Sequence, residues 1–393
     1  MLLVGDQSDI QVVSAMKVLM QSRKNFYDLR GGDTIQLLKT KSELEKLGIK
    51  VDISLDYEPD LREYDLVHLS NVTRIQETYL HVKNAVAQNK PIALSTIYWP
   101  MDEFEKRGQI GIRKIINGCM GIDNEERVKA VARYLKDKDA RDAATRNLWK
   151  IGYSKMQRFV VSHVDYFLPN SELEMDMFCK SFGLKKERYS VIPNAIDADV
   201  ARKQNLTDTP PEFEKYRDAI ICVGRIEPRK NQLGLVKALD QSGYKLVLVG
   251  AVSKNQKNYF EEVKAIINKN DSFFYIPKVE NEKLYQLYKV CRVSALPSWL
   301  DTPGLVSLEA ASMGCSLAVS SKGSTTEYFG DLAEYCLPDD LAGIRLAIER
   351  AYKKTRTEEL RNRIFDNFTW EIAARKTAES YAVLLQNARG SSR

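Results

Sequence analysis

The stretch DAIICVGRIEPRKNQLGLVKAL, residues 218–239, decides the fold. Its apolar start is typical of a buried strand, a glycine loop with Pro, Arg and Lys comes next, and a segment with apolar residues at helical spacing follows. The same succession begins at Met16, where MKVLMQ precedes a loop ending in RGGD and the segment TIQLLKTKSELEKLG. Strands that alternate with helices predict parallel sheets with helical crossovers. We therefore expect an α/β fold with two Rossmann-like halves.

The length of 393 residues agrees with two domains, because a domain usually holds about 100–200 residues. We place residues 16–195 in an N-terminal Rossmann-like domain and residues 196–368 in a C-terminal one. Residues 369–388 have the pattern of an amphipathic helix and are set apart as a C-terminal helix. Residues 1–15 precede the first convincing strand, and we interpret them as an extension, either disordered or upstream of the native start.

Composition narrows the class of protein. With 44% hydrophobic residues, 28% charged residues and a net charge of +6, the chain resembles an ordinary globular protein, and no nucleic-acid partner is expected. The apolar runs have strand length and the start has no basic segment, so neither a membrane span nor a signal peptide is expected. Six cysteines without a CxxC pair favour reduced thiols in the cytoplasm. Three scattered histidines predict no metal site.

The segment from Glu105 to Arg158 is basic, with 14 Lys or Arg against 7 acidic residues. A solvated helical surface is one interpretation. The other is a surface for an anionic or membrane-borne acceptor, because basic helices are attracted to anionic lipid headgroups. The letters of an Asp-x-Asp metal motif occur at Asp137–Asp139 in this segment, where solvated charges are the preferred interpretation.

VGRIEPRKN, residues 223–231, is a candidate phosphate site. Gly224 ends an apolar strand and lets a ligand approach the backbone closely. Arg225 and Lys230 follow across a turn, and an Arg fork with a Lys point charge at the carboxyl end of a parallel strand suits a diphosphate. The alternative is that both are solvated loop charges.

DTPGLVSLE, residues 301–309, is the second candidate. Thr302 as N-cap and Pro303 at the first position predict a helix start, which leaves the amides of Gly304, Leu305 and Val306 free to bind an anion. Glu309 is the sole charged residue between Thr302 and Ser321 and shares a helix face with apolar side chains. A buried carboxylate needs a partner, either a ligand hydroxyl pair or a structural group. Asp301 could equally stabilise the helix N-terminus.

Four segments in register carry a family resemblance: RGGDTIQLLKTKSELEKLGIKVD, FLPNSELEMDMFCKSFG with YSVIPNAID, VGRIEPRKN, and LPSWLDTPGLVSLEAASMGC with STTEYFGD. From about Met16 to Tyr381 the chain resembles the retaining glycosyltransferases of family 4 (glycosyl transferases group 1). The resemblance implies the GT-B fold, in which two Rossmann-like domains with parallel sheets face each other across a cleft. It also implies an acceptor-binding N-terminal domain, a donor-binding C-terminal domain, and a last helix that crosses back to the former.

The resemblance implies roles for individual residues. Arg225 and Lys230 hold the donor diphosphate, Asp301 lies at the sugar hydroxyls, and Glu309 binds the ribose. The other positions that it implies contact the donor are Gly32, Gly224, Lys278, Val279, Gly304, Leu305 and Val306, and Glu327 is an acid of uncertain role.

Two positions depart from the family pattern. Asp301 stands where Glu is usual, which shortens the side chain by one methylene. Tyr98 stands where many members have His, and a tyrosine does not titrate near neutral pH. Tyr98 and Trp99 are therefore interpreted either as a wall for the acceptor or sugar or as ordinary core aromatics.

Together these features predict a cytoplasmic, metal-independent, retaining glycosyltransferase without a cofactor, with a UDP- or GDP-sugar as donor substrate. The expected acceptor is a saccharide or a lipid-linked acceptor of polysaccharide or glycolipid biosynthesis, with peripheral inner-membrane contact through residues 105–158. The alternatives are a nucleotide-sugar epimerase or phosphorylase on the same fold, or a non-catalytic scaffold. A scaffold has no need of Arg225, Lys230 and the TPGLV turn.

Overall fold

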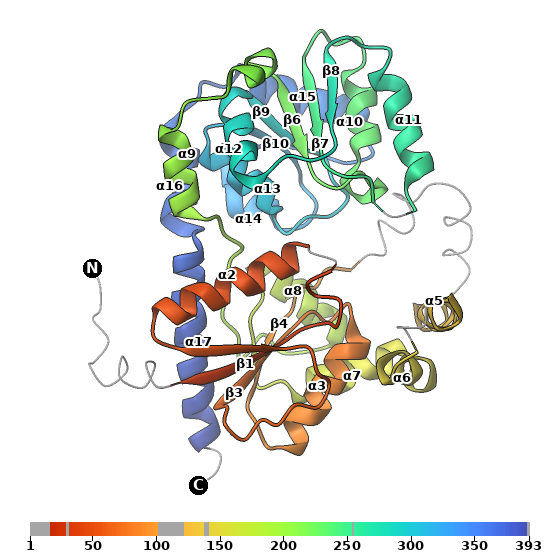
Figure 1. The fold of residues 1–393 in the computed structure, drawn as a ribbon, viewed down its shortest axis with the longest axis vertical. Coiled ribbons are helices and arrows are strands. Elements are labelled where there is room, and N and C mark those ends of the chain that lie inside the picture. Colours follow the sequence, from red (N-terminus) through yellow and green to blue (C-terminus); the bar gives the residue numbers. More distant parts are fainter. Residues whose placement is uncertain (1–15, 29–30, 101–121, 137–140, 254, 391–393) are drawn as a thin grey trace. The chain divides into compact units, whose positions relative to one another are not determined.

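The computed structural model describes residues 16–28, 31–100, 122–136, 141–253 and 255–390. The described residues form two compact units (Figure 1). Unit 1 holds the residues up to Pro100, those from 122 to Pro193, and those from Trp370 onward; unit 2 holds Asn194–Thr369. The expected extension over residues 1–15 lies outside the described residues.

Unit 1 is a five-stranded parallel sheet in the order β2-β1-β3-β4-β5, with helices between and after its strands. Its strands are β1 (Lys17–Gln21), β2 (Lys50–Ser54), β3 (Leu66–Ser70), β4 (Ile92–Ser95) and β5 (Tyr166–Phe167). Its helices are α2 (Gly32–Lys46), α3 (Ile75–Ala87), α5 (Ile122–Lys136), α6 (Ala143–Ile151), α7 (Tyr153–His163), α8 (Glu172–Phe182) and α17 (Trp370–Gly390).

The last helix of the chain, α17, is part of unit 1, where it packs against α2. Tyr381 of α17 is fully buried, and its hydroxyl lies 2.6 Å from Nδ1 of His68 on β3. Ser95 at the end of β4 contacts Nε2 of the same ring at 2.9 Å. A polar contact inside an apolar core thus joins two strands to the C-terminal helix, which the apolar pattern of residues 369–388 alone did not indicate.

Unit 2 is a six-stranded parallel sheet in the order β11-β10-β9-β6-β7-β8. Its strands are β6 (Ile220–Val223), β7 (Leu246–Val249), β8 (Phe273–Ile276), β9 (Val293–Leu296), β10 (Ser316–Ser320) and β11 (Glu334–Cys336). Its α-helices are α9 (Ala198–Leu206), α10 (Gln232–Leu239), α11 (Lys257–Ile267), α12 (Asn281–Val290), α13 (Leu305–Ser312), α14 (Thr325–Phe329), α15 (Leu341–Lys353) and α16 (Glu358–Asn367). Short 3₁₀ turns are η2 (Pro211–Tyr216), η3 (Pro228–Lys230) and η4 (Gly330–Leu332).

Strands β6, β7 and β9 are buried at every residue, as expected when helices cover both faces of a parallel sheet. Five of the cysteines lie in the described residues, and all five are buried free thiols. The two parallel sheets confirm the predicted α/β class with two Rossmann-like halves. Ligands of such sheets bind at the carboxyl ends of the strands, so the loops that follow β6 and β9 in unit 2 are the first place to search for a site.

Candidate active site

The carboxyl ends of β6 and β9 bring the two candidate segments together, because these strands are neighbours in the sheet of unit 2. Gly224 follows β6 with φ of 150°, and its N–H donates to the carbonyl of Val249 at 2.9 Å. A Cβ on the neighbouring Gly250 would lie 2.1 Å from the carbonyl oxygen of Gly224. The close approach of the two loops therefore requires a glycine at position 250, whereas Gly224 is favoured by its positive φ. Gly250 was not predicted from the sequence.

Lys230 and Asp301 form a buried ion pair between these loops. The Lys230 Nζ lies 2.7 and 2.8 Å from the two carboxylate oxygens of Asp301. The side chains are 12% and 9% exposed. Burial raises the pKa of Asp301, but the charges of Lys230 and Arg229 outweigh it, so the pKa lies below its usual range. Asp301 is thus ionised and committed to Lys230 in the ligand-free protein.

Arg229 and Glu227 stabilise the same loop. Arg229 donates to the carbonyl of Leu300 at 2.9 Å and to Oε1 of Glu227 at 3.0 Å. Glu227 in turn accepts a hydrogen bond from the Ser253 hydroxyl at 2.8 Å. Arg225 differs from these residues, because its side chain is 62% exposed and its nearest carboxylate oxygen, on Glu227, lies 3.9 Å away. Its guanidinium therefore keeps its donors available for a ligand.

The helix after Asp301 begins later than predicted. α13 starts at Leu305 with Gly304 as N-cap at φ of 87°, so Thr302 is not the N-cap and Pro303 is not the first helical residue. The cause is a left-handed glycine that turns the chain after Pro303, which the Thr-Pro pattern could not indicate. The first amide groups of a helix have no acceptor within it. The amides of Leu305 and Val306 therefore remain potential anion donors, as expected.

Glu309 lies in the second turn of α13 and is partly buried. Among the residues that the structure describes, none donates a hydrogen bond that meets normal geometry to its carboxylate, and the hydroxyl of the buried Tyr288 has no hydrogen-bond partner. Burial raises the pKa of Glu309 to about 7, and the nearby Tyr288 hydroxyl lowers it only in part. This acid is therefore costly to the free protein.

The remaining donor-site candidates of unit 2 lie on nearby loops. Lys278 is exposed and Val279 half-buried, both between β8 and α12. Glu327 lies in α14 and is half-buried. The loop before α14 fixes Asp301 from the other side, since a Cβ on Gly323 would lie 1.9 Å from the Asp301 carbonyl oxygen. Gly323 was not predicted from the sequence, where its signal is the run of small and polar residues SSKGST.

Unit 1 contains the other candidates. Gly32 is the first residue of α2. Tyr98 packs against Phe178 and Phe182, with ring centroids 5.5 and 5.2 Å apart, which favours the core interpretation for its ring. Trp99 is half-buried.

Glu174, a fully buried acid of α8, was also not predicted from the sequence. Its carboxylate accepts hydrogen bonds from the Thr96 hydroxyl, from the Tyr98 N–H at 2.9 Å and from the Asn170 N–H at 3.0 Å. Burial raises the pKa of Glu174, and these three donors act against the effect. The acid thereby fixes the loop after β4, and its signal in the sequence was its place three residues after the N-cap Ser171.

Two structural features bear on the class of protein. No group of three or more His, Cys, Asp or Glu side chains suited to a metal ion occurs in the described part of the chain. Within the same residues, no helix combines the length and the apolar character needed to cross a membrane.

Known proteins share sequence and fold with this chain. Residues 206–367 match the family Glycosyl transferases group 1. Among curated proteins, the D-inositol 3-phosphate glycosyltransferase of Mycobacteroides abscessus is 25% identical over 170 residues, which is 42% of this chain and 38% of that relative. The chain thus spans less than two thirds of the length of that relative.

Among solved structures, the sucrose-phosphate synthase of Thermosynechococcus elongatus superposes with a TM-score of 0.64 at 17% identity, over 95% of this chain and 100% of that one. The Anabaena protein HepE in complex with UDP and glucose gives a TM-score of 0.58 at 14% identity, over 96% and 99%. At these identities the likeness concerns the fold. The chain therefore has the two-sheet α/β fold of the GT-B glycosyltransferases, and its residues 206–367 carry the sequence pattern of the glycosyl transferases group 1.

Proposed function

We propose that the chain is a retaining, metal-independent glycosyltransferase that moves one sugar from a nucleotide-sugar to a hydroxyl group of a saccharide or lipid-linked acceptor. The observation that carries this proposal is Glu309, a partly buried acid whose nearby donor, the Tyr288 hydroxyl, makes no hydrogen bond of normal geometry to it. It lies one turn after the free amides of α13. A ribose diol supplies the two donors that its carboxylate lacks, and a diphosphate suits the amides.

The donor diphosphate would be held by two kinds of positive group. Arg225 is exposed and free to form a forked contact with phosphate oxygens. Lys230, whose charge is balanced by Asp301 in the free protein, can donate the N–H that this ion pair leaves over, and the amides of Leu305 and Val306 add the positive end of the α13 dipole. These groups can balance the charge of a departing diphosphate, so we propose that the protein itself stabilises the leaving group.

The other contacts follow from the same pose of the donor. The backbone around Lys278 and Val279 is the proposed contact of the base, and Gly224 allows the phosphates to approach the loop. Asp301 would accept hydrogen bonds from the sugar hydroxyls through the lone pairs of its carboxylate that are not used by Lys230.

In the proposed reaction, the bond between C1 of the sugar and the diphosphate oxygen breaks, and its electron pair leaves with the diphosphate. The acceptor oxygen attacks C1 on the same face, and its proton passes to the departing phosphate oxygen. Positioned charges that are in place before the reaction lower the barrier most effectively. The products are the glycosylated acceptor and a nucleoside diphosphate.

A UDP-sugar or GDP-sugar is the proposed donor, and the complex of the Anabaena protein with UDP and glucose supports the former. A saccharide or lipid-linked acceptor of polysaccharide or glycolipid biosynthesis is proposed, with unit 1 as the acceptor domain. Gly32, and Tyr98 or Trp99, remain candidate contacts of that unit. The proposed location is the cytoplasm, with peripheral contact to the inner membrane.

A thermal-shift panel with UDP, GDP, ADP, CMP and dTDP tests the proposal. A ligand at 100 times its dissociation constant adds about 2.7 kcal/mol to the folded state, which shifts the melting temperature by roughly 5–10 °C. We expect one nucleoside diphosphate to stabilise the protein and Arg225→Ala to lose that shift. Arg217→Ala is the matched control, because Arg217 is 57% exposed and belongs to the same unit.

Once the stabilising nucleoside diphosphate is known, the donor sugar can be identified by product analysis with nucleotide-sugars that carry the same base. If no nucleotide shifts the melting temperature, or if both arginine variants respond like the parent protein, the donor site is wrongly placed and the transferase proposal loses its basis.

A further inference from the structure

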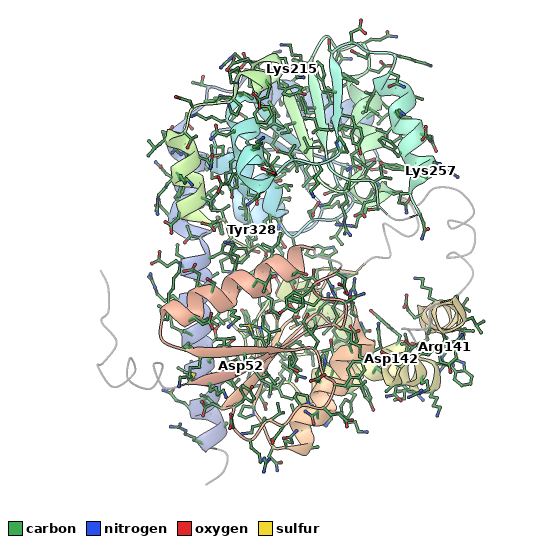
Figure 2. All side chains as sticks on the ribbon, in the orientation of Figure 1. Asp52, Arg141, Asp142, Lys215, Lys257 and Tyr328 are labelled. Carbon is green, nitrogen blue, oxygen red and sulfur yellow. The ribbon has the colours of Figure 1, made fainter. Side chains whose placement is uncertain are left out.

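We propose that Tyr288 is a positioning residue whose hydroxyl holds the Glu309 carboxylate in the orientation that binds a ribose, so that the site selects ribonucleotides over deoxyribonucleotides. The inference rests on the proposed function, because it concerns the same donor site. Tyr288 lies in α12 and Glu309 in α13, and these two helices of unit 2 pack against each other. Figure 2 shows side chains filling the space between the helices and the sheet of this unit.

The hydroxyl of Tyr288 is buried without a hydrogen bond. The side chain is fully buried and belongs to the apolar core of unit 2. No group among the described residues forms a hydrogen bond of normal geometry with its hydroxyl oxygen. A buried tyrosine hydroxyl usually has a partner, because an unsatisfied polar group in a core costs free energy. A phenylalanine would fill the same space without this cost, so packing does not account for the hydroxyl.

The ring of Tyr288 is fixed by contacts that do not involve its hydroxyl. Tyr285, one turn earlier in α12, packs nearly perpendicular to it, with ring centroids 6.3 Å apart and 85° between the ring planes. The Cys315 thiol donates to the carbonyl oxygen of Tyr288 at 3.1 Å and secures the backbone at this position. The hydroxyl is therefore held at a defined point in the core before any ligand binds.

Glu309 is the acid that lies within reach of this hydroxyl. Burial and, after it, the charge of Glu309 raise the pKa of Tyr288. Burial also raises the pKa of Glu309, and the Tyr288 hydroxyl acts against that effect as a nearby donor. The hydroxyl nevertheless forms no bond of normal geometry in the free protein. The two groups are thus close enough to form a hydrogen bond after a small adjustment of the glutamate side chain.

An ionised Glu309 can complete this bond. A carboxylate offers about four acceptor positions, and a ribose diol fills two of them. The Tyr288 hydroxyl can donate to a third, and hydrogen bonds to a charged acceptor are the stronger ones. This bond would fix the plane of the carboxylate, whose terminal torsion is otherwise broad. The tyrosine therefore limits the carboxylate to the orientation that faces the diol.

The orientation of the carboxylate determines selectivity, because the 2′- and 3′-hydroxyls point in fixed directions from the ribose ring. A carboxylate that faces both hydroxyls accepts two bonds, whereas a 2′-deoxyribose leaves it one donor short. A site built to bind a hydroxyl rejects an analogue that lacks it, since a polar group is then left unpaired. In this arrangement Tyr288 acts through Glu309 and not on the reacting atoms.

Calorimetric titration of the full chain at pH 8 tests the inference with UDP and 2′-deoxy-UDP, or with GDP and 2′-deoxy-GDP if the nucleotide panel selects guanine. We expect the parent protein to prefer the ribonucleotide by a factor on the order of ten. Tyr288→Phe should weaken binding of the ribonucleotide about tenfold and that of the deoxyribonucleotide clearly less. The preference for ribose should therefore shrink in this variant.

Stability and a double-mutant cycle separate positioning from a structural role. We expect Tyr288→Phe to be at least as stable in urea as the parent protein, since the hydroxyl has no partner in the free protein. In the background of Glu309→Ala, Tyr288→Phe should have no further effect on binding. Tyr216→Phe is the matched control, because Tyr216 is 7% exposed and lies in η2 of the same unit. It should bind and select like the parent protein.

The pH dependence of binding gives a further readout. Tyr288→Phe should move the acid midpoint of affinity to higher pH, because the ionised Glu309 loses a donor. The other titratable groups that face Tyr288 are Tyr285, Cys222 and Cys315. Burial raises the pKa of all three, to about 12 for both thiols. They keep their neutral form at neutral pH, so the midpoint reports on Glu309.

Two results would overturn the inference while the proposed function stands. One is an unchanged preference for ribose in Tyr288→Phe, whether or not this variant is less stable. The other is an effect of Tyr288→Phe that persists undiminished in the Glu309→Ala background. A parent protein that binds no nucleoside diphosphate would overturn the proposed function and the inference with it, so the parent protein alone distinguishes the two failures.

Discussion

The side-chain amine of Lys230 lies within 2.8 Å of both carboxylate oxygens of Asp301. This pair links the loop after β6 to the loop after β9, and both side chains are nearly removed from solvent. The lysine that would face a donor phosphate is thus fixed before any ligand binds. Asp301, shorter than the Glu of the resembling family, is at the same time the anchor of that lysine.

Removal of one member of this pair should destabilise the protein. Lys230→Met leaves an ionised Asp301 in a buried site, and we expect a loss of about 3–5 kcal/mol in the free energy of unfolding, measured with urea. Asp301→Asn should cost a similar amount. The double variant Lys230→Met, Asp301→Asn should lose clearly less than the sum of the two.

The exposed pair Arg217 and Glu214 is the matched control, because both side chains are about half exposed. Its disruption should cost less than about 1 kcal/mol. Additive losses at Lys230 and Asp301 would show that the two charges are stabilised independently of each other.

The succession of strand, glycine loop and helix over residues 218–239, repeated from Met16, was sufficient to predict the two parallel sheets, because strand and helix periodicities are local properties. The start of α13 could not be predicted in the same way, since it depends on the left-handed turn at Gly304. The partners of Glu174 and His68 also escaped prediction, because hydrogen bonds between residues far apart in sequence have no local pattern. The ion pair of Asp301 with Lys230 also joins residues far apart in sequence, so it could not be predicted either.

Glu309 should make the stability of the protein depend on pH. The pKa is about 7 in the folded state, against 4.5 for the ordinary group. Between these pH values Glu309 is ionised in the unfolded chain and protonated in the folded protein. The contribution of Glu309 to the free energy of unfolding therefore decreases as pH rises from 4.5 to about 7, and it is constant above pH 7. We expect Glu309→Gln to be more stable than the parent protein above pH 7, on the order of 1–3 kcal/mol.

Urea unfolding of the two proteins at several pH values measures this difference, and other titrating groups cancel in the subtraction. The difference should be absent near pH 4 and constant above about pH 7. A difference of the same size at both ends would mean that the carboxylate already has a partner in the free protein.

The same acid should couple nucleotide binding to pH. A ribose diol donates to the ionised carboxylate, so affinity for the stabilising nucleotide should fall as pH decreases below about 7. The fall reaches about tenfold per pH unit if the ionised form alone binds. The nucleotide phosphate also titrates near pH 6, which makes Glu309→Gln the necessary reference in a calorimetric titration. The variant should bind more weakly at pH 8 and retain only the dependence that comes from the phosphate.

His68 should make unit 1 sensitive to acid. Burial lowers the pKa of His68 to about 4. A histidine whose folded pKa lies below its unfolded value of 6.5 contributes stability above pH 6.5, and this is lost as pH falls from 6.5 towards 4, by about 1.4 kcal/mol per pH unit. His81 is also buried with a pKa of about 4, so it adds to the slope.

The substitution His68→Gln should flatten the acid slope by the contribution of one group. Tyr381→Phe should cost about 1–3 kcal/mol at pH 8, since it leaves Nδ1 of the buried ring without a partner. An unchanged acid slope in His68→Gln would assign the acid sensitivity to other groups.

Glu174 should hold the loop after β4 in place through the hydrogen bonds that Thr96, the Tyr98 N–H and the Asn170 N–H donate to it. Both carboxylate oxygens accept: one from Thr96 and the Tyr98 N–H, the other from the Asn170 N–H. A glutamine retains one acceptor oxygen and turns an NH₂ group towards a donor, so Glu174→Gln should lower stability by about 1–3 kcal/mol despite its equal size. Glu172→Gln in the same helix is the control, because Glu172 is 50% exposed and pairs with Lys186 at the surface; its effect should stay within about 1 kcal/mol.

Hydrogen exchange of the Tyr98 and Asn170 amides adds a local readout. Faster exchange of both in Glu174→Gln supports a carboxylate that fixes the loop, whereas unchanged exchange would mean that the surrounding packing alone holds it.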